Sequence, residues 1–470
     1  MQLAQQEQPG LGTGLKPRHI TMISIAGVIG AGLFVGSSNA IRTAGPAVLI
    51  SYALAGTLVV LVMRMLGEMA TANPDTGSFS TYADRALGRW AGFSVGWLYW
   101  WFWVLVIPVE ATAAANILSN WIGAPQWVWA LAVTLALTAS NLASVGNFGE
   151  FEFWFATVKV VAIVAFIVIG LLAIVGVLPG SDAQGTPGLS AAGGFLPNGV
   201  TAVLAGMLIT MFSFMGTEIV TIAAAESPDP EKGVRRAVNS VISRIALFYI
   251  GSIFVVVAIV PWNSGDLVEN GSYQTVLQSL GIPGAATIMD IVILTAVASC
   301  LNSALYTASR MVFSLSRRGD GPPWLSRVSR HGVPWTAILA STAVGFLAVV
   351  GNYALPDRIF SLLLATSGAL ALVVYGFIAL SQVFLRRRLD EGHEPMIRMW
   401  LFPWLTYATI AFIVVVLALM VVLPGQRVEL VLSLVLTAVV VLVGVRHGRR
   451  HGVDVRTAAG AGSAAARDGR

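Results

Sequence analysis

Long apolar stretches recur through almost the whole chain and constrain its fold more than any other feature. Each is close to the length of about 20 residues that a helix needs to cross a bilayer. Charged residues make up 11% of the chain, against about 25% in soluble proteins. The sequence therefore predicts an all-α polytopic membrane protein with twelve transmembrane helices. The predicted spans are 20–43, 46–70, 91–118, 126–144, 151–178, 199–224, 239–261, 284–314, 335–351, 358–385, 401–423 and 427–445.

The basic residues predict how the chain is threaded. If the N-terminus lies in the cytoplasm, 24 of the 28 Lys and Arg residues fall on the cytoplasmic side, as the positive-inside rule requires. We therefore expect cytoplasmic tails at 1–19 and 446–470, the second without regular structure, around one transmembrane domain at 20–445. The bilayer accounts for the positive charge, so no nucleic-acid partner is expected.

Several function classes lack their sequence signatures. The chain has no GxxxxGK[ST] motif for a nucleotide-driven pump and no HExxH motif for a metalloprotease. Its histidines fall in tails and loops, and its single cysteine, Cys300, excludes an intramolecular disulfide. We therefore expect neither an enzyme nor a bound metal or cofactor.

The first span is rich in glycine at the depth of the membrane. Between Ile23 and Gly36 it carries Gly27, Gly30, Gly32 and Gly36, and each glycine costs a helix about 1 kcal/mol relative to alanine. A helix that breaks there exposes N–H groups on one half and C=O groups on the other, which suit the carboxylate and ammonium of an amino acid. The alternative is close helix packing through the GxxxG pair Gly32 and Gly36.

The sixth span repeats this pattern. Small and polar residues interrupt it at Met211–Glu218, and an odd number of spans lies between the two breaks, so the broken helices cross in opposite directions. Paired breaks in two inverted halves are the best sequence indication of a transport site at the membrane midplane. Phe212 beside the break is a candidate lid, with core or lipid packing as the alternative.

Four charged groups lie where charges are costly. Lys159 is predicted to be a proton or cation site, unless its chain snorkels to the interface. Glu110 follows Pro108 and forms either an interhelical bond or a substrate contact. Glu218 either caps the second half of the broken helix or ties it to a neighbour. Glu68 is expected to pair with Arg64 one turn earlier.

The remaining polar candidates have simpler expectations. Glu150 and Glu152 open the fifth span and are predicted to cap its N-terminus. Ser299 and Ser303 share one face of the eighth span and either bridge helices or receive the Lys159 ammonium. The aromatic residues of 97–103 are expected to form an interfacial belt.

Several longer runs carry a family resemblance. The sequence resembles bacterial amino-acid permeases of the amino acid–polyamine–organocation superfamily, and most of all the branch that carries 4-aminobutyrate (GABA), over about Leu15 to Arg450. The outer loop 180–198, the loop 263–283 and the C-terminal tail match poorly. The matching runs are 15–34, 74–84, 96–111, 148–154, 211–227 and 299–320.

The resemblance implies a LeuT-like 5+5 inverted repeat, about 20–178 and 199–385, with discontinuous helices 1 and 6 and peripheral helices at 401–445. It implies that the span-one break receives the substrate carboxylate and that carbonyls of both breaks receive the amine. It also implies that Phe212 closes the outer path and that Lys159 replaces the sodium of other relatives, reaching carbonyls near Ala26–Ile29 and the hydroxyls of Ser299 and Ser303. The implied substrate residues are Val28, Ile29, Gly30, Ala31, Gly32, Glu110, Phe212, Ser213 and Met215.

Together these features predict a proton-coupled GABA importer in the inner membrane that works by alternating access. Its coupling ion is the proton, and no oligomeric state follows from the sequence. A permease for proline, aromatic or cationic amino acids is the alternative within this class. A membrane sensor or a channel is the alternative outside it, although a sensor should carry an output domain and a channel should show uncoupled flux.

Overall fold

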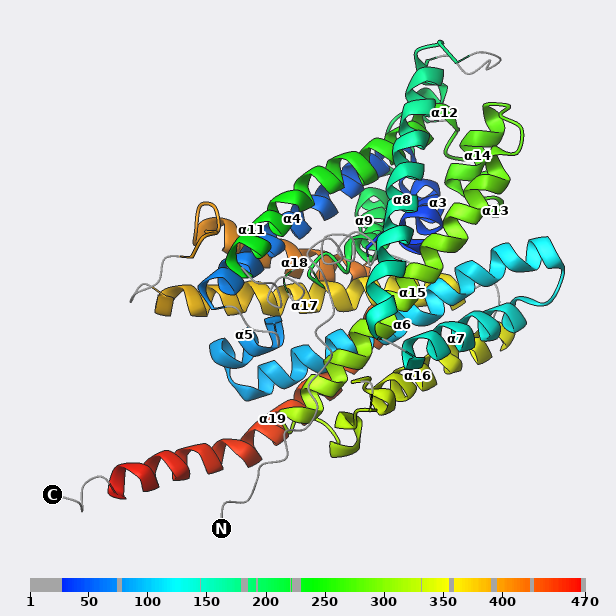
Figure 1. Cartoon of the computed structure of the whole chain (residues 1–470). Coiled ribbons are helices and arrows are strands. Elements are labelled where there is room, and N and C mark those ends of the chain that lie inside the picture. The colour runs from blue at the N-terminus through cyan, green and yellow to red at the C-terminus, as the bar shows by residue number, and fades with distance from the viewer. Residues whose placement is uncertain are drawn as a thin grey trace.

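The computed structural model is helical throughout the residues it describes. These are 28–73, 78–143, 145–178, 185–191, 193–219, 221, 230–330, 332–354, 359–389, 395–422 and 427–465. Two long helices, α6 (Arg89–Ile122) and α15 (Ala285–Arg317), pack along one another near the middle of the bundle (Figure 1).

The other elements surround this pair (Figure 1). In chain order they are α2 (Ala31–Phe34), α3 (Gly36–Ala44), η1 (Gly45–Ala47), α4 (Val48–Ala72), α5 (Ser78–Leu87), α7 (Gln126–Ala143), α8 (Val145–Ile174), η2 (Pro187–Ser190), α9 (Gly199–Phe214), α11 (Pro230–Arg244), η3 (Ile245–Gly251), α12 (Ser252–Ile259), α13 (Asp266–Glu269), α14 (Ser272–Ser279), η4 (Pro323–Ser326), α16 (Trp335–Ala354), α17 (Ile359–Leu389), α18 (Trp404–Val422) and α19 (Arg427–Ala465).

Many of these helices are long and apolar enough to cross a bilayer. Within the described ranges there are nine such segments, the first of which, Ala31–Ala72, contains the second predicted span and the later part of the first. Two shorter apolar helices, Gly199–Phe214 and Trp335–Phe346, add to them. The chain is therefore a multi-pass membrane protein, as predicted.

The fraction of apolar surface that is buried inside the protein is high in the central helices and low in the last two helices. In α6 and α15, 72% and 67% of the most apolar window is buried inside the protein, against 28% in α18 and 17% in Leu430–Arg449. A helix that leaves most of its apolar surface uncovered faces lipid. The last two helices therefore lie at the edge of the bundle, and α19 stays helical to Ala465, so the expectation of an irregular tail from Arg446 is wrong for that part.

Glu68 is a structural anchor rather than half of a local pair. Its carboxylate is fully buried and accepts hydrogen bonds from Arg386, from Gln382 Nε2 at 3.1 Å and from the Met399 amide at 2.7 Å. Arg64, the predicted partner, donates to the Arg398 carbonyl instead. The prediction is wrong because α17 packs against α4 and brings a better-placed guanidinium to the buried carboxylate.

Replacing Glu68 with alanine should destabilise the fold strongly. Removing one partner of a buried ion pair costs about 3–5 kcal/mol, because the other partner keeps its charge without compensation. We expect a clear fall in the unfolding temperature in detergent, measured by fluorescence size-exclusion after heating. Glu269→Gln, at an exposed position, is the control, and equal unfolding temperatures for the two variants would contradict the anchoring role.

Candidate functional site

The sixth-span break lies where the sequence predicted it. Helix α9 ends at Phe214, and Met215 has an extended backbone (φ −66°, ψ 143°). Gly216 follows with φ +102°, a conformation that residues with a Cβ rarely adopt. The Gly216 amide donates to both oxygens of Glu218 at 3.1 and 3.2 Å. Glu218 therefore satisfies a backbone amide of the break itself, and the predicted cap of the second half-helix stays a prediction.

The first-span break has a matching carboxylate. Residues 28–30 are not helical, α2 begins at Ala31, and the earlier part of this span lies outside the described residues. The Ala31 amide donates to both oxygens of Glu110 on α6 at 3.0 and 3.1 Å. Glu110 thus forms an interhelical bond, and it does so on one of the three residues predicted to hold the substrate carboxylate.

The glycines of this break allow close approach between helices. A Cβ on Gly30 would come within 2.5 Å of Glu110 Oε1, and one on Gly32 within 2.9 Å of both Ser213 Cα and Phe212 Cδ1. Real Cβ atoms essentially never make such contacts. A side chain does not fit at Gly30 or Gly32, because α6 lies against the first and α9 against the second. The two interrupted helices therefore pack directly on each other at Gly32 and Ser213.

A small cavity lies where the breaks meet. Its free volume is about 10 Å³, roughly the space of one water molecule. The Phe212 and Phe102 rings lie in its wall, 6.2 Å apart between centroids. It brings together five predicted site residues with four others; the lining residues are Val28, Gly32, Phe102, Trp103, Val106, Glu110, Phe212, Met215 and Cys300.

Lys159 lies in a buried polar cluster. Its Nζ donates to Ser299 Oγ at 3.0 Å, as predicted, and the Ser299 hydroxyl donates to Glu152 Oε2 at 2.6 Å. Asn302 Nδ2 donates to the other Glu152 oxygen at 2.9 Å. Lysine, serine and glutamate are each 0% exposed. A lysine paired in this way has no need to snorkel to the interface.

Glu152 was predicted to cap the fifth span, and that prediction is wrong. Helix α8 begins at Val145, so Glu152 lies two turns inside it, on the same face as Lys159 seven residues later. Ser303 lies close to the Glu152 carboxylate, but its hydroxyl has no hydrogen bond of normal geometry in the described part of the chain. The expected reach of Lys159 to carbonyls near Ala26–Ile29 stays a prediction, and the first two of these residues lie outside the described part.

The cluster and the cavity are linked through α15. Cys300 follows Ser299 and lines the cavity with Glu110, while Ser299 holds Lys159. Glu110 and Lys159 also interact electrostatically. One helix therefore connects the predicted proton group to the carboxylate on the first break.

A wider polar cleft opens beyond the cavity, toward α13 and α14. Its free volume is about 390 Å³, and Val35, Thr112 and Asp290 are among its lining residues. Gln274 Nε2, also in its wall, donates to Asp290 Oδ1 at 2.9 Å. Its α13 and α14 walls belong to the segment predicted to lie on the outer side.

Several residues of the site carry little sequence signal. Trp103 was assigned to an interfacial belt, but it is 1% exposed and lines the cavity, so the belt prediction is wrong there. Tyr249 lies in a plain apolar run, and its hydroxyl donates to the Ser213 carbonyl at 2.7 Å. The spacing of seven between Glu152 and Lys159 was the one available signal for their shared face.

Comparison with known proteins identifies the family. The family model for amino acid permeases matches residues 19–452. The chain belongs to the amino acid permease family. This permease is 62% identical over 431 residues to a probable GABA permease of Pseudomonas aeruginosa, covering 91% of both chains. It is 60% identical over 432 residues to the gamma-aminobutyric acid permease of Escherichia coli (91% and 93%) and 51% identical over 431 residues to that of Bacillus subtilis (91% and 92%). It is a membrane transporter rather than an enzyme.

Proposed function

We propose that this permease imports GABA and close analogues together with a proton, by alternating access. The observation that carries the proposal is the meeting of two interrupted helices, each with a buried glutamate on a break amide, beside a buried lysine cluster. The choice of substrate is supported by its likeness, at 51–62% identity, to two gamma-aminobutyric acid permeases and one probable GABA permease.

The substrate fits the chemistry of the breaks. GABA is a zwitterion whose charges lie at the two ends of a three-carbon chain. Its carboxylate is proposed to meet the amides of Gly30, Ala31 and Gly32, and its ammonium the carbonyls near Val28 and Ser213. Ile29, Phe212 and Met215 belong to the same proposed site. Because the cavity has room for about one water, Phe212 and Glu110 must move for substrate to enter.

Coupling is proposed to run through the Lys159 cluster. A protonated Lys159 donates to Ser299 and is balanced by Glu152, with Ser303 beside them. When Lys159 loses its proton toward the cytoplasm, its attraction to Glu152 is lost and the cluster is weakened. Because α15 carries both Ser299 and the cavity residue Cys300, this change would reach Glu110 and the first break. A proton and a substrate that act on one structure in this way share a coupling free energy.

The finer architecture belongs to the same proposal. We infer twelve crossings, a LeuT-like inverted repeat at about 20–178 and 199–385, and peripheral helices at 401–445. The breaks at 28–30 and 215–218, in spans of opposite direction, support this arrangement. The excess of basic residues on one side supports an inner-membrane protein with both termini in the cytoplasm. The proton is the coupling ion, and no cofactor is proposed.

The substrate assignment is tested by ligand-induced stabilisation of the purified permease. A ligand that binds the folded state raises its unfolding temperature in proportion to the logarithm of concentration over Kd. We expect the largest rise with GABA and smaller rises with proline, phenylalanine and arginine. A larger rise with one of these three, and none with GABA, would overturn the substrate assignment while leaving the transport site in place.

A further inference from the structure

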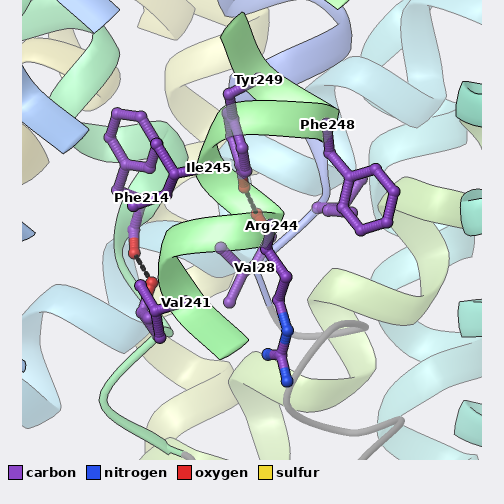
Figure 2. A pocket seen from close by; sticks show the side chains of 9 residues that line it. Val28, Phe214, Val241, Arg244, Ile245, Phe248 and Tyr249 are labelled. Atoms are coloured by element: carbon purple, nitrogen blue, oxygen red, sulfur yellow. Dashed lines mark hydrogen bonds between the residues drawn. The ribbon is translucent and has the colours of Figure 1, made fainter. Parts of the chain in front are cut away.

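Tyr249 bridges the two breaks from a third helix. It lies in η3, a π-helical segment between α11 and α12, and its side chain is buried. Its hydroxyl donates to the Ser213 carbonyl at 2.7 Å. It also lies 3.3 Å from the Val28 carbonyl (Figure 2). The carbonyls belong to the sixth-span and first-span breaks respectively. One hydroxyl thus lies within hydrogen-bond distance of backbone acceptors of both interrupted helices.

The ring of Tyr249 is held in place by other aromatic residues. Its centroid lies 4.6 Å from that of Phe214 and 6.4 Å from that of Tyr52. In Figure 2 the Tyr249 ring descends from η3 toward Val28, with Phe214 at its side. π-Helical turns are rare and are frequently found at functional sites. The hydroxyl is therefore directed at the breaks by both its backbone and its packing.

The same carbonyls are the acceptors that the proposed function assigns to the substrate ammonium, and the inference rests on that assignment. A tyrosine hydroxyl has one proton to donate, and an ammonium has three. Val28 lines the adjoining cavity, which has room for about one water, so a substrate that brings its ammonium to the Val28 carbonyl from this side has to push the Tyr249 hydroxyl aside. Each carbonyl has two lone pairs, so the two donors compete for the space beside the carbonyls rather than for a single acceptor site.

We propose that Tyr249 is a specificity-determining residue that competes with the substrate ammonium for the Ser213 and Val28 carbonyls. Glu110 acts in the same way at the other end, because its carboxylate holds the Ala31 amide that is assigned to the substrate carboxylate. In the closed site, the Tyr249 hydroxyl thus occupies the carbonyls assigned to the substrate ammonium, and the Glu110 carboxylate occupies the amide assigned to the substrate carboxylate. A ligand must replace both, so a molecule carrying an ammonium and a carboxylate is favoured over one that carries a single charge.

The test is the affinity of Tyr249→Phe for GABA. Loss of the hydroxyl leaves the two carbonyls without their internal donor, so the substrate ammonium no longer displaces a hydrogen bond. We expect the Kd for GABA, measured by titration of the purified permease, to fall by about three- to tenfold, the range for one hydrogen bond of ordinary strength. Inhibition by butyrate, which has no ammonium, should not change between wild type and variant.

Tyr273→Phe is the matched control. Tyr273 is also fully buried, packs on an aromatic ring (Phe166, 4.4 Å) and donates its hydroxyl at 2.8 Å, but to Ser252 rather than to a break. The Kd of the Tyr273→Phe variant for GABA should equal that of the wild-type permease. If Tyr249→Phe folds poorly, Tyr249→Met, whose flexible side chain fills irregular gaps, gives the same test.

An unchanged or weaker affinity in Tyr249→Phe, with the control at wild-type affinity, would overturn competition. A weaker affinity would make the hydroxyl a direct substrate contact instead. A wrong substrate assignment gives a different result, because the wild-type permease then binds another amino acid and does not bind GABA. The Tyr249 comparison is then made with that amino acid, whose ammonium meets the same carbonyls.

Discussion

Lys159→Ala should abolish accumulation of substrate against its gradient while leaving exchange of substrate across the membrane intact. Lys159 is fully buried and tied through Ser299 to Glu152, so it is the group through which a proton is proposed to act. Without it, substrate binding and proton movement lose their coupling free energy. In vesicles with an imposed pH gradient, the ratio of internal to external GABA should fall to about one.

Lys232→Ala is the control for this variant. Lys232 is an exposed lysine on α11, so its removal should leave accumulation at the wild-type level. Counterflow of labelled GABA, measured without a pH gradient, separates loss of coupling from loss of folding. Accumulation that persists in Lys159→Ala would remove the lysine from the coupling mechanism.

Gly32→Ala is expected to block transport through a single methyl group. The new Cβ would lie 2.9 Å from the Ser213 backbone and from the Phe212 ring, and a backbone atom cannot move aside as a flexible side chain does. Overpacking of this kind costs about 1–3 kcal/mol. Because the strain falls on the contact between the two breaks, we expect the initial rate of GABA uptake to fall by about tenfold or more.

Gly36→Ala distinguishes this contact from general helix packing. Gly36 is the other member of the GxxxG pair, yet a Cβ there would meet Leu364 Cδ2 at 3.4 Å, an ordinary van der Waals distance. Its uptake should stay near that of wild type. Equal losses in the two variants would mean that the glycines serve close packing, the alternative that the sequence left open.

The two breaks were predictable because they violate rules that an ordinary membrane helix obeys. Glycine and isolated charges are costly inside a bilayer, so Gly30, Gly32, Glu110 and Glu218 attract attention without any knowledge of their partners. The contact of Lys159 with Ser299 followed from the implied placement of the fifth and eighth spans. Apart from that contact, these predictions rest on the energetic cost of a residue type inside the membrane, which the local sequence is enough to show.

The partners of these residues depend on packing between distant segments. Glu68 pairs with Arg386, 318 residues away, and a local partner at Arg64 was the natural but wrong choice. Glu152 was misassigned because the predicted span began at 151 whereas α8 begins at Val145. Tyr249 gave no signal because a tyrosine in an apolar run is ordinary, and only the approach of η3 to both breaks gives its hydroxyl a role.

Accumulation of labelled GABA by vesicles containing the wild-type permease, with the exterior made more acidic than the interior, tests the central claim most directly. For one proton per substrate, a difference of one pH unit supplies about 1.4 kcal/mol, which supports about a tenfold concentration ratio. We predict that internal GABA rises above external GABA and that the ratio collapses when the pH gradient is removed. GABA that equilibrates without accumulating, whatever the gradient, would contradict proton-coupled import.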